Sequence, residues 1–95
     1  MKDIIIIGAG GIGREVAWII EEINEITPTW NILGFIDDNL EMKGKIFNGY
    51  NVLGDIDYLK TLKEKLYVVV AISNPKVKSY IVRKLEDKFD FATIV

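Results

Sequence analysis

Three glycines near the amino terminus have the spacing of a phosphate-binding loop. Gly8, Gly10 and Gly13 stand in the segment GAGGIG, a G-x-G-x-x-G motif that follows a run of isoleucines. In this motif the first glycine allows a tight turn, the second lets a ligand approach the backbone, and the third lets a helix pack closely on a strand. The free amides and the dipole at the start of that helix favour a phosphate or pyrophosphate. The alternative is a turn that only requires small residues.

A pair of carboxylates forms the second candidate group. Asp37 and Asp38 end an apolar segment, and Asp37 lies 24 residues after Gly13. This is close to the spacing of about 20 residues at which a carboxylate contacts ribose hydroxyls. If the strand continues through both residues, their side chains point in opposite directions and only one of them faces a ligand. We expect that residue to be Asp37. The alternative is that both aspartates begin a turn at Asp38-Asn39.

Ser73 and Asn74 directly follow the most strand-like segment of the chain, YVVVAI at Tyr67–Ile72. Ligands of open α/β sheets bind outside the carboxyl ends of the strands, so both side chains are candidates to contact a phosphate or a base. Asn74 also precedes a proline, which is typical of a residue that caps a helix. The two interpretations of Asn74 are compatible.

Two large side chains follow the glycine motif. Arg14 falls in the first turn of the expected helix, where a cation opposes the helix dipole. A bound phosphate would compensate for that placement, and an arginine that is solvated or paired with a glutamate is the alternative. We interpret Trp18 as a packing residue or part of a partner surface rather than as a ligand contact.

The composition excludes much of the usual enzyme chemistry. The 95 residues contain no cysteine and no histidine, so a disulfide, a thiolate nucleophile, a cysteine-bound zinc and an imidazole base are all absent. The chain is 49% hydrophobic, with 12 basic and 14 acidic residues and a net charge of −2. This balance gives no basic surface for nucleic acid. No segment resembles a targeting signal or a membrane span, so we expect a cytoplasmic protein.

The patterns predict alternating strands and helices. The isoleucine run at Lys2–Ile7 lacks alternation, which is typical of a parallel strand covered on both faces. Strands are also expected at Trp30–Asp37, Tyr67–Ile72 and Phe91–Val95, and helices from Gly11 to about Ile26, from Asp55 as N-cap to about Leu66, and from Asn74-Pro75 to about Lys88. The segment from Asp38 to about Gly49 is expected to be a loop, with a possible short strand at Ile46-Phe47.

This order indicates one α/β domain over residues 1–95, with a Rossmann-like open parallel sheet of four to five strands and helices on both faces. It corresponds to half of a doubly wound domain. One half suits one mononucleotide, whereas a nicotinamide dehydrogenase requires a second half and a substrate domain.

Four segments in this order, IIGAGGIGREVA, LGFIDDN, GYNVLGD and VVVAISNP, resemble the amino-terminal domain of PglD/NeuD-type sugar O-/N-acyltransferases. The resemblance covers essentially the whole chain. It implies a domain that binds the UDP part of a UDP-amino-sugar. In that case Gly10, Gly11 and Gly13 face the diphosphate, Asp37 and Asp38 contact ribose or uracil, and Ser73 and Asn74 line the same cleft.

In that family a left-handed β-helix of hexapeptide repeats follows, which forms trimers, binds acetyl-CoA and carries the catalytic histidine. This chain ends at FATIV, where relatives continue, and has Ile12 where many have histidine. The resemblance therefore implies a domain that is not catalytic by itself, with no cofactor of its own. Acetyl-CoA and a trimer are expected for full-length members. We expect the isolated domain to be a monomer or weak dimer that binds UDP with micromolar-to-millimolar affinity.

Two alternatives share these features. Nucleotide- or CoA-binding-like domains of polysaccharide-biosynthesis dehydratases and sugar transferases have a similar glycine loop and a segment like GYNVLGD, with proline usual at the position of Asn51. The GREVA and AISNP segments favour the acyltransferases. The other alternative is an interaction domain that binds no ligand.

Overall fold

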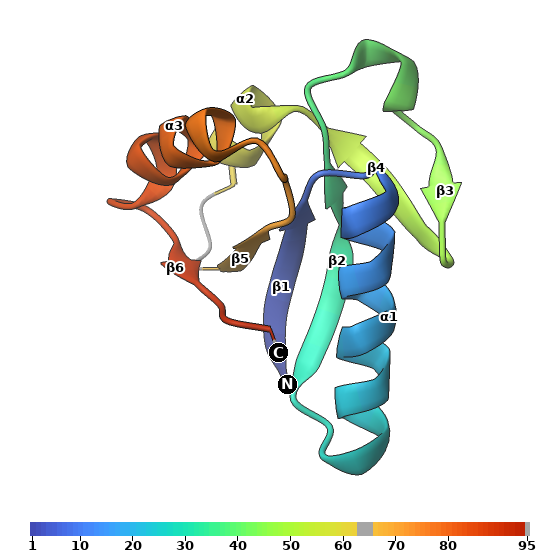
Figure 1. Ribbon diagram of the computed structural model, residues 1–95. Helices are drawn as coiled ribbons and strands as arrows, with labels where there is room; N and C mark the ends of the chain where they lie inside the picture. The colour runs from blue at the N-terminus through green and yellow to red at the C-terminus, as the bar shows by residue number, and fades with distance from the viewer. Residues whose placement is uncertain (63–65, 95) are drawn as a thin grey trace.

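A six-stranded sheet forms the centre of the computed structural model, which describes residues 1–62 and 66–94 (Figure 1). The strand order is β3-β4-β2-β1-β5-β6. The strands are β1 (Lys2–Ile7), β2 (Trp30–Ile36), β3 (Ile46–Phe47), β4 (Tyr50–Gly54), β5 (Tyr67–Val70) and β6 (Asp90–Phe91). The helices are α1 (Gly11–Ile26), α2 (Ile56–Lys60) and α3 (Pro75–Leu85), with a short 3₁₀ turn at Leu40–Met42. Within the described ranges, no helix combines the length and apolar character needed to cross a membrane.

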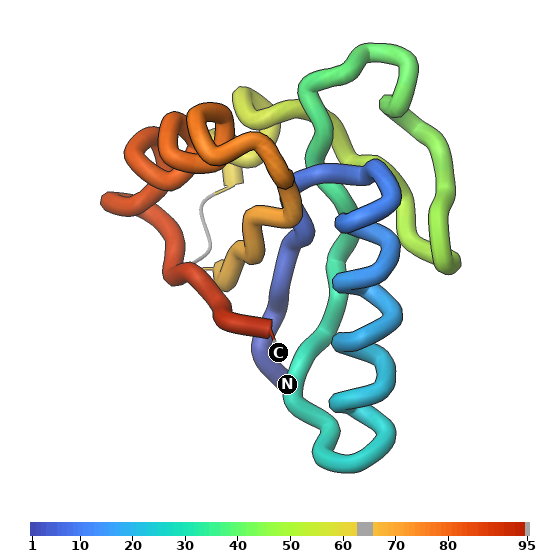
Figure 2. The backbone as a smooth tube through the Cα atoms, viewed as in Figure 1, coloured from blue at the N-terminus to red at the C-terminus, as the bar shows by residue number. Residues whose placement is uncertain are grey.

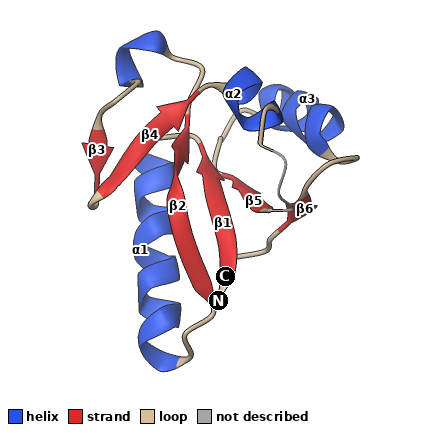
Figure 3. Ribbon diagram, turned by 180° about the vertical axis from the view of Figure 1, so that it is seen from behind, coloured by secondary structure: helices blue, strands red, loops and turns tan. Residues whose placement is uncertain are grey.

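The isoleucines of β1 supply both faces of the sheet. Ile4 and Ile6 pack in a buried cluster with α1, whereas Ile5 and Ile7 pack in a second cluster with α2 and α3. Figure 3 shows the same division, with α1 on one face and the two other helices on the opposite face. All four side chains are fully or almost fully buried, which explains the absence of alternation in this strand. The predicted α/β sheet with helices on both faces is confirmed.

The sheet has six strands rather than the predicted four to five, because the GYNVLGD segment contains a strand, β4, that the sequence patterns do not predict. β4 pairs in parallel with β2 and antiparallel with β3. A two-residue turn at Asn48 and Gly49 joins β3 to β4, and both residues have positive φ angles of 56° and 84°. This is the pattern of a tight hairpin turn that favours Asn-Gly. The predicted short strand at Ile46-Phe47 is confirmed as β3.

Several of the predicted helices and strands extend further along the chain than those in the structure. α2 stops at Lys60 instead of Leu66. The N–H groups of Thr61 and Leu62 donate to the carbonyls three residues back, Tyr58 and Leu59, at 3.0 and 3.1 Å, which is the tightened last turn typical of a helix end. The rest of that predicted helix includes residues 63–65, which lie outside the described residues. β2, β5, α3 and β6 end at Ile36, Val70, Leu85 and Phe91 rather than at Asp37, Ile72, Lys88 and Val95, the last of which is also outside the described residues.

The topology brings the candidate residues to one edge of the sheet. β1 lies between β2 and β5 and is parallel to both, so the carboxyl ends of these three strands meet. The chain passes from β1 to β2 on one side of β1 and later returns to β5 on the other side. Open α/β sheets bind ligands in the crevice that forms where the strand order reverses in this way. Figure 2 shows both chain termini at the opposite end of the molecule.

Candidate functional site

Two of the motif glycines are required by the packing of the loop itself. Gly8 has a φ of +110°, and a Cβ atom there would lie 2.6 Å from the Ala71 carbonyl oxygen. At Gly13 a Cβ atom would lie 1.8 Å from the Gly8 carbonyl oxygen. The loop therefore turns tightly against β5, and the first turn of α1 rests directly on its backbone. These are the two roles that the motif predicts for its first and third glycines.

The start of α1 is open. Gly10 and Gly11 are exposed, and no atom lies within 4 Å of a Cβ atom built on either one. The first intrahelical hydrogen bond runs from the Arg14 N–H to the Gly10 carbonyl at 3.1 Å, so the amides of Gly11, Ile12 and Gly13 have no partner inside the helix. The Gly10 cap has no side chain, and the first turn contains no acidic residue. A helix start of this kind has the amides and the partial positive charge that an anion requires.

Asp37 connects the glycine loop to the end of β2. Its Oδ2 atom accepts a hydrogen bond from the Ala9 N–H at 2.9 Å, and its Oδ1 atom accepts one from the Asn39 N–H at 2.9 Å. The carboxylate of Asp38 is directed elsewhere, because its Oδ1 atom accepts from the Ile56 N–H at 3.0 Å. Each carboxylate oxygen has a second lone pair that remains for a ligand hydroxyl.

A cavity of about 250 Å³ lies below these two carboxylates. Both Asp37 and Asp38 line it, because β2 ends at Ile36 and the alternation expected of a continuing strand does not apply. The other lining residues are apolar or glycine: Ile7, Gly8, Ile36, Ile56, Ile72, Val77 and Ile81. This volume is smaller than the roughly 300–1,000 Å³ of sites that enclose a whole ligand. The cavity therefore suits one ring of a nucleotide.

Ser73 and Asn74 follow β5 and lie at the same edge of the sheet, but their side chains have different roles. The Asn74 Oδ1 atom accepts hydrogen bonds from the N–H groups of Lys76 and Val77 at 2.9 and 3.3 Å. This confirms Asn74 as the cap of α3, with Pro75 in the first turn. Ser73 is exposed beside it, and its hydroxyl is placed to meet solvent or a ligand.

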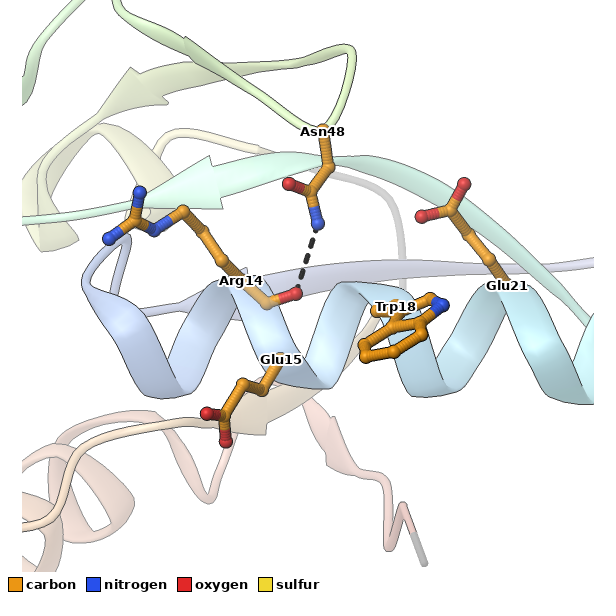
Figure 4. Close-up of a pocket in the computed structure, with 5 residues that line it drawn as sticks. All are labelled: Arg14, Glu15, Trp18, Glu21 and Asn48. Carbon is orange, nitrogen blue, oxygen red and sulfur yellow. Dashed lines mark hydrogen bonds between the residues drawn. The ribbon is translucent and has the colours of Figure 1, made fainter.

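Arg14 is exposed and contacts an aromatic ring. Its guanidinium carbon lies 5.1 Å from the centre of the Phe47 ring, a distance typical of a cation–π contact. The contact holds the side chain on the side of the β3–β4 hairpin. In Figure 4 the guanidinium group points along α1 toward the start of the helix. The predicted phosphate contact of Arg14 is compatible with this direction.

Lys78 is a candidate residue that no sequence motif singles out. This residue lines a groove of about 570 Å³ together with Ile12, in the first turn of α1. Lys78 is the only charged residue among the described residues that line this groove. α3 carries several exposed cations without a motif, so only the tertiary structure identifies the one beside the glycine loop.

The exposure of Trp18 contradicts its interpretation as a packing residue and leaves the interpretation as a partner surface open. Its side chain is 64% exposed, and it lines a shallow pocket with Arg14 and Asn48. The residues that α1 buries are Gly13, Ala17 and Ile20.

Comparisons with known proteins identify relatives of most of this chain. The family model described as the PglD N-terminal domain matches residues 3–85. The GDP-perosamine N-acetyltransferase of Escherichia coli O157:H7 is 39% identical over 74 residues, which cover 77% of this chain and 33% of that protein. The chain therefore spans about a third of the length of this curated relative.

Two solved structures share the fold. The acetyltransferase domain of PglB from Neisseria gonorrhoeae FA1090, in complex with acetyl coenzyme A, has a TM-score of 0.70 and 24% identity over 90% of this chain and 39% of its own. RSP in complex with β-NADH has a TM-score of 0.67 and 17% identity over 98% of this chain and 54% of its own. At these identities the likeness shows the fold alone.

Proposed function

Because the chain belongs to the family of PglD N-terminal domains, we propose that it binds the nucleotide part of a nucleotide-linked amino sugar, for acetyl transfer carried out elsewhere in a longer acyltransferase. Membership of this family favours the acyltransferases over the dehydratase and sugar transferase alternative. The E. coli relative is named as an N-acetyltransferase of a GDP-linked sugar, and this name supports the proposed substrate class. The chain contains no histidine and no cysteine, which supports a binding role rather than a catalytic one.

The single observation that carries the proposal is the open start of α1. The diphosphate would accept hydrogen bonds from the amides of Gly11, Ile12 and Gly13, and the helix dipole would stabilise its charge. Arg14 and Lys78 flank this start and would contribute two cations to a dianionic ligand. Gly8 acts indirectly, because it allows the loop to hold this shape, and the absence of a side chain at Gly13 serves the same purpose.

The ribose and the base would occupy the edge between β1, β2 and α2. Ribose hydroxyls would donate to the remaining lone pairs of Asp37 and Asp38, and the base would enter the apolar cavity of about 250 Å³. Ser73 would contact the ligand from the end of β5, with Asn74 fixing the position of α3. We favour a pyrimidine and hence UDP, because the cavity is small, and GDP is the alternative that the E. coli relative suggests.

Calorimetric titration with UDP, GDP, NADH and coenzyme A tests this proposal. We expect one nucleoside diphosphate to bind with micromolar-to-millimolar affinity, because an isolated domain lacks the contacts of the remaining protein. Uridine and guanosine serve as controls and should bind far more weakly, since they lack the diphosphate. Binding of coenzyme A alone would contradict the proposal. Absence of binding for all ligands would favour the interaction domain that needs no ligand.

A further inference from the structure

The β3–β4 hairpin and α1 together form a second pocket, which shares Arg14 with the proposed nucleotide site. It has a volume of about 490 Å³ and is lined by Arg14, Glu15, Trp18, Glu21 and Asn48 (Figure 4). In the figure Asn48 and the carboxylate of Glu21 lie above α1, the ring of Trp18 lies in front of the helix, and Glu15 extends below it. The pocket thus combines one exposed aromatic face with two carboxylates, an amide and a guanidinium group.

Two of the polar side chains are held in place. The Asn48 amide donates a hydrogen bond from Nδ2 to the Arg14 carbonyl at 3.0 Å, and the tight hairpin turn fixes the Asn48 backbone. Glu21 is half-buried next to Tyr50 of β4. Burial, the charge of the Glu21 carboxylate and a hydrogen bond between the two side chains all raise the pKa of the Tyr50 phenol.

This combination matches the chemistry of a sugar ring. A pyranose has an apolar face of C–H groups, which packs on an exposed aromatic ring, and a rim of hydroxyl or amino donors, which carboxylates accept. The Asn48 amide and the Arg14 guanidinium would donate to ring or hydroxyl oxygens. A purely structural tryptophan would instead be buried, whereas 64% of the Trp18 side chain is exposed.

The pocket lies within reach of the proposed phosphate site. From Gly13, the last of the three amides that would hold the diphosphate, to Trp18 the helix rises about 7.5 Å, which the glycosidic oxygen and a pyranose ring can span. Arg14 lies between the two sites, one turn into α1, and its guanidinium points toward the helix start.

The other groove beside the start of α1 offers a poorer match. Apart from Lys78 and Thr93, the described residues that line it are apolar or aromatic, among them Val16, Val69 and Phe91. The hydroxyl groups of a sugar would lose their water there without gaining enough partners.

We propose that the pocket of Arg14, Glu15, Trp18, Glu21 and Asn48 binds the sugar ring of the nucleotide-linked amino sugar, with Trp18 packing on its apolar face. This inference rests on the proposed nucleotide site, because the diphosphate brings the sugar to the pocket. It predicts that the sugar adds affinity beyond that of the free nucleotide, and that Trp18 supplies much of this gain.

The test compares each free nucleotide with its sugar conjugate, by calorimetry of UDP against UDP-glucosamine and of GDP against GDP-mannose. We expect Trp18→Ala to reduce the affinity for the conjugate about tenfold, a loss typical of one aromatic contact, while the affinity for the free nucleotide stays the same. Ile26→Ala is the matched control, because Ile26 is another exposed apolar residue of α1, 87% exposed and outside the pocket. This variant should bind all four ligands as the parent chain does.

A second measurement needs no variant that could misfold. In a ¹H–¹⁵N spectrum of the parent chain, the indole N–H signal of Trp18 should move when the conjugate is added and stay in place with the free nucleotide. If the nucleotides bind but Trp18→Ala weakens the conjugate no more than Ile26→Ala does, the sugar pocket is wrong and the nucleotide site stands. If the parent chain binds neither UDP nor GDP nor their conjugates, both proposals are wrong.

Discussion

Replacing Gly13 by alanine is expected to prevent folding, or to lower the free energy of unfolding by more than about 3 kcal/mol. The added Cβ atom would lie 1.8 Å from the carbonyl oxygen of Gly8 and 2.8 Å from its carbonyl carbon. Both are backbone atoms in the tight turn after β1, so no side-chain rotation relieves the overlap. The first turn of α1 would have to move away from the sheet and lose contacts of the buried cluster around Ile6 and Ala17. Urea unfolding followed by circular dichroism measures the effect.

Gly11→Ala is the matched control for this variant, because it adds the same methyl group two residues earlier. No atom lies within 4 Å of a Cβ atom at Gly11, and alanine favours a helix more than glycine does, by up to about 1 kcal/mol. We expect its stability to equal or slightly exceed that of the parent chain. Similar stabilities for the two variants would mean that α1 does not rest on the Gly8 turn as the structure shows.

Gly10→Val is expected to abolish nucleotide binding while the fold is retained. Gly10 has a φ of −77° and a ψ of −165°, an extended conformation that valine adopts readily. Its side chain would project into open space, since nothing lies within 4 Å of the added Cβ atom. That space is the one a phosphate needs to reach the amides of Gly11 and Ile12. Loss of two charge-assisted hydrogen bonds corresponds to a reduction in affinity of about a hundredfold or more.

The variant is checked by two measurements on the same sample. Urea unfolding should show a stability close to that of the parent chain, which separates a blocked site from a disrupted fold. Calorimetric titration should then show little or no heat with the nucleoside diphosphate that the parent chain binds. Normal binding by a folded Gly10→Val protein would restrict the glycine loop to a structural role.

Sequence patterns predict those parts of the fold that depend on local chemistry or on burial of a whole segment. The isoleucine run of β1 indicates a strand covered on both faces, and Asp55 and Asn74 both cap helices through their side chains as expected. β4 is different, because Tyr50–Gly54 is a short segment with an asparagine and a glycine. It is a strand because β2 and β3 pair with it, and that stabilisation is absent from its own residues.

The residues of the candidate site also fall into two groups: those that a local motif predicts and those whose positions depend on tertiary structure. The roles of Gly8 and Gly13 follow from the motif, because they arise from backbone packing within one β–α connection. The positions of Arg14, Trp18 and Lys78 depend on distant segments: Arg14 lies over Phe47 of the hairpin, and Lys78 shares a groove with α1. Contacts of this kind are set by tertiary structure, which a pattern along the chain does not contain.

The most direct test of the nucleotide site is a ¹H–¹⁵N titration of the backbone amides with UDP and GDP, each compared with its nucleoside. We expect the signals of Gly11, Ile12 and Gly13 to move most, and to move only when the phosphates are present. Signals at the end of β2, including Asn39, should move less. A nucleotide that binds elsewhere and leaves these three amides unmoved, or nucleosides that move them equally, would contradict an anion site at the start of α1.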